Sequence, residues 1–138
     1  MRWAILDTAV YIDHWEGALG VEDALADVRR AFVVRHSSVV LSELRRGART
    51  AEARRHVSAL HRIAAVQWAP TAEDWWRAGE LVRTIGDAHD WEIAKRREFQ
   101  NDALIALTAR HHGATVVTRN RGDFELLARK LHLAVVLL

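Results

Sequence analysis

Four acidic residues lie beside apolar segments of the chain, where an unpaired carboxylate is costly to bury. They are Asp7, Glu43, Asp102 and Asp123. Carboxylate oxygens are the ligands that Mg²⁺ prefers, and several carboxylates crowded together raise one another's pKa until a cation neutralises them. A divalent ion held in this way polarises an oxygen of a substrate and lowers the pKa of a bound water molecule. The four acids are therefore candidates for one metal-dependent hydrolytic site.

Each of these acids also has a purely structural interpretation. Asp7 and Asp123 could cap the helices that follow them, and Asp102 could favour the dipole at a helix N-terminus. Glu43 could pair with Arg46 on the surface of its own helix. A common site is favoured only if the fold brings all four side chains to one place.

The elements that must position these acids alternate between short apolar runs and amphipathic segments. We expect strands at residues 3–6, 31–34, 65–69, 115–118 and 134–138. We expect helices at residues 8–12, 21–30, 39–46, 50–64, 72–85, 102–112 and 124–130. Strands that are apolar without alternation are typical of a sheet covered on both faces. This pattern predicts an α/β protein, a three-layer α/β/α sandwich with a mainly parallel sheet of about five strands.

The predicted sheet also predicts where the acids meet. In open parallel sheets, ligands bind outside the carboxyl ends of the strands. Asp7 directly follows the first strand, and Asn120 and Asp123 directly follow the fourth. Asp102 is expected to open a helix capped by Asn101, after a polar stretch at residues 86–100 that forms either a loop or a helix extension over the site.

Four short segments follow one another along the chain: ILDT at 5–8, SVVLSELRRG at 38–47, NDALIA at 101–106 and VTRNRGDF at 117–124. Together and in this order they resemble the PIN-domain family, and more narrowly the VapC-type ribonuclease toxins of bacterial toxin–antitoxin pairs. The segments span nearly the whole chain, so we expect one PIN-like nuclease domain over residues 1–138.

The resemblance implies an endoribonuclease that hydrolyses RNA phosphodiester bonds with Mg²⁺ or Mn²⁺. Carried over by position, Asp7, Glu43 and Asp102 are catalytic metal ligands. Some relatives carry an aspartate where this chain has Asn120, and others use the aspartate before the phenylalanine. We therefore take Asp123 as the fourth catalytic ligand and Asn120 as a supporting residue. The family also implies a homodimer and a cognate antitoxin protein that blocks the acidic site.

Other residues near the predicted site are assigned supporting roles. Thr8 and Thr118 are expected to orient carboxylates or metal-bound water through their hydroxyls. Arg119 and Arg121 are possible contacts for RNA phosphates, although a solvated surface is the alternative. We expect contacts with a partner at Trp15, Trp76 and the segment 87–97.

The composition limits the class of protein. The chain has 138 residues and no cysteine, which excludes disulfides and thiolate metal sites. No apolar run is long enough to cross a membrane, so we expect a soluble cytoplasmic protein without a membrane partner. Basic groups are almost all arginine, with Lys95 and Lys130 as the two lysines. Arginine suits phosphate contacts, but GC-rich codons would produce the same bias.

Two other functions remain open from the sequence. A non-catalytic PIN-like module that binds RNA or protein would explain why Asn120 stands where some relatives have an acid. An aspartyl-phosphate enzyme would use Asp7 as nucleophile, but such enzymes often carry an acid two residues later, and this chain has Ala9. Metal-dependent RNA cleavage separates the nuclease from both alternatives.

Overall fold

The computed structural model describes residues 2–138 and places five strands and seven helices in them. The strands are β1 (Trp3–Leu6), β2 (Val33–Ser37), β3 (Gln67–Trp68), β4 (Thr115–Thr118) and β5 (Val135–Leu137). The helices are α1 (Thr8–Trp15), α2 (Val21–Ala31), α3 (Ser38–Gly47), α4 (Ala51–Ile63), α5 (Ala72–Ala88), α6 (Ile93–His111) and α7 (Arg121–Leu131). Within the described residues, no helix is long and apolar enough to span a bilayer.

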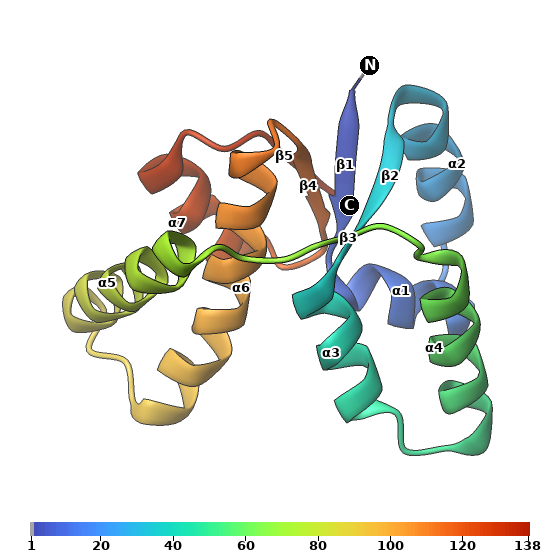
Figure 1. The fold of residues 1–138 in the computed structure, drawn as a ribbon, viewed down its shortest axis with the longest axis horizontal. Helices are drawn as coiled ribbons and strands as arrows, with labels where there is room; N and C mark the ends of the chain where they lie inside the picture. Colours follow the sequence, from blue (N-terminus) through green and yellow to red (C-terminus); the bar gives the residue numbers. More distant parts are fainter. Residues whose placement is uncertain (1) are drawn as a thin grey trace.

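All five strands are parallel and lie in the order β3-β2-β1-β4-β5. Helices α1 to α4 gather on one side of the sheet and α5 to α7 on the other (Figure 1). The predicted α/β architecture with a parallel sheet of five strands is confirmed. The chain moves outward from β1 through β2 to β3 and then crosses back to β4, so the direction of winding reverses between β1 and β4. This reversal is the point at which an open α/β sheet forms a crevice for ligands.

The core explains why the central strands read as unbroken apolar runs. Ile5 of β1 and Val116 of β4 are fully buried because helices cover both faces of the sheet. In the second half of α6, the residues 103–109 are all buried. This helix therefore lacks the polar face of a surface helix and fills the space between the sheet and its neighbours.

Two expected boundaries, the start of α6 and the end of β2, are wrong. Helix α6 begins at Ile93, so Asp102 lies in its middle and Asn101 does not cap it. Strand β2 runs to Ser37, and its side chains Arg35 and His36 are half-buried rather than part of a polar loop. The guanidinium of Arg35 lies over the ring of Trp3, 5.7 Å from its centroid, which explains how a charged residue fits in this strand.

The polar stretch at 86–100 forms a tight turn and the first part of α6. The backbone N–H of Trp91 donates to the carbonyl of Gly86 at 2.9 Å. Arg96 closes the turn, since its Nε donates to the carbonyl of Trp91 at 2.8 Å and its Nη1 to Asp87 at 2.9 Å. The Trp91 ring packs edge-on against the buried ring of Phe99, with centroids 4.8 Å apart. These contacts fix the start of α6 relative to the core.

Candidate metal centre

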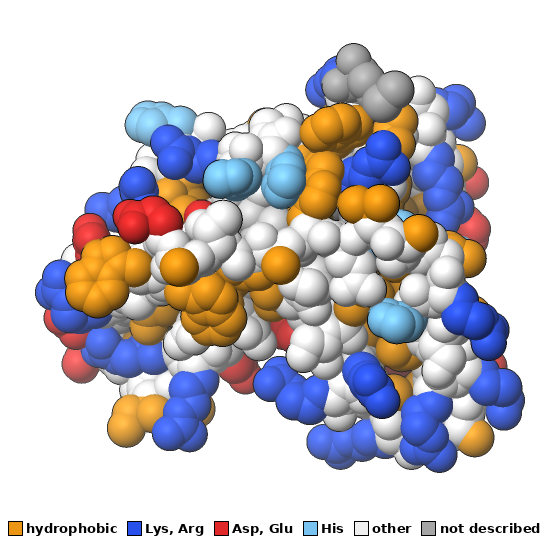
Figure 2. Space-filling model, in the orientation of Figure 1, with side chains coloured by type: hydrophobic (Ala, Val, Ile, Leu, Met, Phe, Trp, Pro, Cys, Tyr) orange, Lys and Arg blue, Asp and Glu red, His pale blue; other side chains and the backbone are white. Residues whose placement is uncertain are grey.

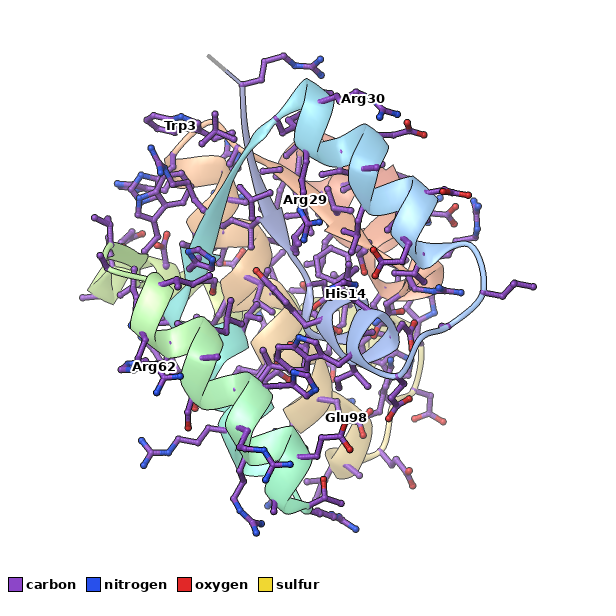
Figure 3. All side chains as sticks on the ribbon, turned by 90° about the vertical axis from the view of Figure 1, so that its right-hand side faces the viewer. Trp3, His14, Arg29, Arg30, Arg62 and Glu98 are labelled. Atoms are coloured by element: carbon purple, nitrogen blue, oxygen red, sulfur yellow. The ribbon has the colours of Figure 1, made fainter. Side chains whose placement is uncertain are left out.

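An open pocket of about 450 Å³ lies at the carboxyl ends of β1 and β4. The four predicted acids all line it, and they come from four different elements: the end of β1, helix α3, helix α6 and helix α7. A further acid, Glu98, lines the same pocket from α6 and projects beside the end of α1 (Figure 3). The fold therefore brings the four acids together. Roles as helix caps, as a dipole partner or in a surface ion pair would not require the acids to share one pocket.

Asp7 is buried, with 4% of its surface exposed. Its Oδ2 accepts a hydrogen bond from the Thr118 hydroxyl at 2.8 Å, and its Oδ1 accepts one from the Thr8 backbone N–H, also at 2.8 Å. Asp7 is thus the N-cap of α1 as well as a pocket residue. Burial raises the pKa of Asp7 above its ordinary value, although the two hydrogen bonds partly oppose this rise.

Glu43 reaches the pocket from α3. The Thr8 hydroxyl donates to its Oε1 at 2.8 Å, and the Asn101 amide donates to its Oε2 at 3.3 Å. Burial raises the pKa of Glu43, and the nearby Asp7 raises it further. Thr8 therefore joins two acids, with its backbone on Asp7 and its hydroxyl on Glu43.

Asp102 carries the most perturbed carboxylate of the pocket. Burial, followed by the charge of Asp7 and the proximity of Asp123 and Glu43, raises its pKa to about 9. The Asn120 amide donates to its Oδ2 at 3.3 Å. A carboxylate so crowded by other acids binds a proton or a cation readily.

Asp123 differs from the other three acids. Lys95 donates to both of its oxygens, each at 2.7 Å, and the Asn120 amide donates to Oδ2 at 3.1 Å. Burial acts to raise the pKa of Asp123, but the hydrogen bonds and the charge of Lys95 outweigh it and hold the pKa below its ordinary value. The carbonyl oxygen of Asn120 accepts from the Asp123 backbone N–H at 3.4 Å, so Asn120 is the N-cap of α7 and Asp123 is not.

Sequence reasoning missed four residues that build this site. They are Lys95, Arg97, Glu98 and Asn101. A usable signal was present, because Lys95, Glu98 and Asp102 have the spacing of one helix face. That spacing becomes informative only once α6 is known to begin at Ile93. The rarity of lysine in this arginine-rich chain also set Lys95 apart.

Arg119 and Arg121, the expected phosphate contacts, are both paired with acids. Arg119 lies 3.1 Å from Asp13, and Arg121 lies 3.1 Å from Glu125. The arginines that line the pocket are instead Arg46 and Arg97.

The donor set suits a hard divalent cation, because the pocket offers carboxylate oxygens with raised pKa values and no histidine lines it. Within residues 2–138, however, no three acidic or histidine side chains have the spacing of a completed metal site. Thr8 joins Asp7 to Glu43, and Asn120 joins Asp102 to Asp123. Lys95 contacts Asp123 alone among these acids. Asp7, Glu43 and Asp102 are the acids that accept only uncharged donors, and they are the ones that an ion would draw together.

Comparison with known proteins identifies both sequence and structural relatives. The pattern of the PIN domain matches residues 4–130. One similar solved structure is VapBC2 from Rickettsia felis bound to a DNA fragment from its promoter, with 22% identity, a TM-score of 0.68 and 99% of both chains covered. A second is VapBC-5 from Mycobacterium tuberculosis, a member of the VapBC family of toxin–antitoxin systems, with 22% identity, a TM-score of 0.61 and 100% of both chains covered. A third is FitAcB from Neisseria gonorrhoeae, with 24% identity, a TM-score of 0.58, and 96% of this chain and 95% of that chain covered. No curated protein sequence matches the chain.

Proposed function

The chain belongs to the PIN-domain family, as its motifs predict, and from this premise we propose that it is a divalent-metal-dependent endoribonuclease, the toxin of a toxin–antitoxin pair. One observation carries the proposal: carboxylates from four elements surround one pocket at the reversal point of the sheet. In open α/β folds generally, the crevice at this reversal point is where ligands bind. The solved relatives named above are toxin–antitoxin proteins, which supports the narrower assignment.

In this proposal Asp7, Glu43 and Asp102 hold Mg²⁺ or Mn²⁺. Asp123, the fourth acid expected from the sequence, lines the same pocket but is paired with Lys95. A bound ion would polarise the scissile phosphate and lower the pKa of a water molecule. Thr8 and Thr118 keep the carboxylates in position, because each hydroxyl donates to a different acid. The threonines thus act through the acids and do not themselves attack the RNA.

RNA would approach over a surface rich in arginine. Arg46 and Arg97 line the pocket and would contact RNA phosphates there. Figure 2 shows Lys and Arg side chains gathered over α3 and α4, and Arg45, Arg54 and Arg62 line a second pocket there. This surface supports binding of cytoplasmic RNA along its backbone rather than recognition of a base sequence.

An antitoxin would bind in the groove next to the acids. This groove of about 520 Å³ lies between α1, α3 and α4, with Trp15, Leu44 and Val57 among its apolar residues. Ile12 and Glu43 line both the groove and the acidic pocket. An apolar peptide segment ending in a basic residue would therefore fill the groove and place its charge among the acids.

A second copy of the chain would cover the exposed aromatic face of α5. Trp75 and Trp76 expose 51% and 77% of their surface. Trp75 also lines a pocket with Arg46 and Asn101, beside the acidic site. A homodimer through this face would bury both tryptophans and extend the wall of the site.

The experiment that tests the function compares wild-type protein with Asp7→Asn on structured and single-stranded RNA. We expect cleavage with Mg²⁺ or Mn²⁺, none after chelation, and none with the variant. Sequencing RNA 5′ ends after induced expression then locates the cuts in cells. A wild-type protein that binds RNA equally with and without metal and never cleaves it would support a binding module instead.

A further inference from the structure

Lys95 is held in place by contacts that no other lysine or arginine near the pocket has. Its Nζ lies 2.7 Å from both oxygens of Asp123 and 5.0 Å from the centre of the Trp91 ring. Trp91 is fixed in turn by Phe99 and by the turn that Arg96 closes. The ammonium is therefore positioned by a rigid part of the fold rather than by a chance surface contact.

The pairing leaves little of Asp123 free for a metal ion. Both of its oxygens accept from Lys95, and Oδ2 accepts from Asn120 as well. The side chain of Asp123 is 11% exposed and that of Lys95 is 32% exposed, so the pair lies partly out of water. In such a setting a charge-assisted, two-oxygen contact is strong, and breaking it would leave a poorly solvated charge.

We propose that Lys95 supplies a built-in positive charge in place of a second divalent ion, so that the site binds one ion at Asp7, Glu43 and Asp102. This inference rests on the proposed metal-dependent function and specifies how many ions it uses. One divalent ion balances the charge of two of the four predicted carboxylates, and Lys95 balances the charge of a third, Asp123. In two-metal sites a second ion balances the remaining carboxylate charge and also stabilises the leaving oxygen.

The choice of lysine agrees with this role. An ammonium is a compact point charge on a flexible stem, whereas a guanidinium is a wide planar fork. The chain uses arginine almost everywhere else, and its other lysine, Lys130, lies exposed near the end of α7.

The test counts Mn²⁺ ions per chain by calorimetric titration and by electron paramagnetic resonance, with folding checked by circular dichroism. Wild-type protein should bind one ion. Lys95→Gln should bind a second ion, with an affinity at least about tenfold above any second site in wild type. Lys130→Gln removes the same charge far from the pocket and should still bind one ion.

A double variant makes the test independent of how well Lys95→Gln folds. Lys95→Met combined with Asp123→Asn removes both charges of the pair. Because Asp123 is not a ligand in this proposal, the double variant should bind one ion with an affinity within about threefold of wild type.

Three results would overturn the inference: two ions in wild type, one ion in Lys95→Gln, or a loss of tenfold or more in the double variant. A wild-type protein that binds no Mn²⁺ would instead overturn the proposed function, and the inference would fall with it. The two failures are thus distinguishable in one titration series.

Discussion

The two sides of the acidic pocket hold their carboxylates in different ways. On the side of β1 and α3, Asp7 and Glu43 accept hydrogen bonds from hydroxyl and amide groups, which orient a carboxylate without cancelling its charge. On the side of α7, Asp123 is paired with the ammonium of Lys95. The difference teaches that proximity to a site does not give equal roles to its acids: the first side retains its negative charge for an external cation, and the second side is already compensated.

The largest effect is expected from the acid that lies between the two sides. Asp102→Asn keeps the shape of the side chain but removes its charge, so RNA cleavage should fall by at least about a hundredfold. Asp123→Asn should reduce cleavage less, because Asp123 is compensated by Lys95. Single-turnover cleavage rates with Mg²⁺ measure both. Equal losses of cleavage rate in Asp102→Asn and Asp123→Asn would contradict the proposed difference between the two sides of the pocket.

A smaller effect is expected from a residue that only positions an acid. Thr118→Val removes the hydroxyl that donates to Asp7 and accepts from the Asn120 backbone N–H at 2.9 Å. The affinity for Mn²⁺ should fall by about tenfold. Thr108→Val is a matched control, because Thr108 is equally buried but donates only to the Leu104 carbonyl. If both variants bind Mn²⁺ like wild type, Thr118 does not hold Asp7 for an ion.

The crowding of acids predicts a pH dependence in the metal-free protein. Folding raises the pKa of Asp102 from 3.8 to about 9, so the folded state binds more protons than the unfolded state between these values. The free energy of unfolding should therefore fall as the pH rises through this range. Asp102→Asn should flatten the profile. Urea unfolding in the presence of a chelator measures it, and parallel profiles for the two proteins would contradict the prediction.

The smallest effect on the site is expected from the far end of α6. Gly113 follows this helix with φ +65°, and Gly113→Ala would strain the backbone there by about 1 kcal/mol. The affinity for Mn²⁺ should not change, because the site residues of α6 lie between its start and Asp102, at its middle. Urea unfolding and Mn²⁺ titration separate the two quantities. A loss of Mn²⁺ affinity in Gly113→Ala would mean that metal binding depends on the overall free energy of unfolding.

Much of the fold followed from apolar runs in the sequence, since β1 and β4 are central strands buried on both faces. The start of α6 could not be predicted in the same way. Its first half is polar because it faces the pocket and solvent, and its second half is buried on all sides, so neither half shows the pattern of a surface helix. The sequence therefore predicted Asp102 as a site residue but placed it at the wrong point of its helix.

The partners of the acids were harder to predict than the acids themselves. A carboxylate beside an apolar run is visible in one dimension, whereas the pairing of Lys95 with Asp123 joins residues 28 positions apart through a turn. Asn101 and Glu98 were hidden for the same reason. Thr8 and Thr118 were found because Thr8 lies two residues after the end of β1 and Thr118 is the last residue of β4, and the sheet brings both strand ends to the pocket.

The hydrogen bond between Asp7 and Thr118 joins residues 111 positions apart, and this has a consequence for synthesis on the ribosome. The chain emerges from its N-terminus, so Asp7 and Glu43 appear long before the strand that must lie beside β1. A contact of such long sequence separation cannot form until both of its strands have been made. A nascent or truncated chain that ends before β4 carries three of the four acids but lacks Thr118 and Asp123, so the proposed metal site is incomplete until β4 and the start of α7 have been made.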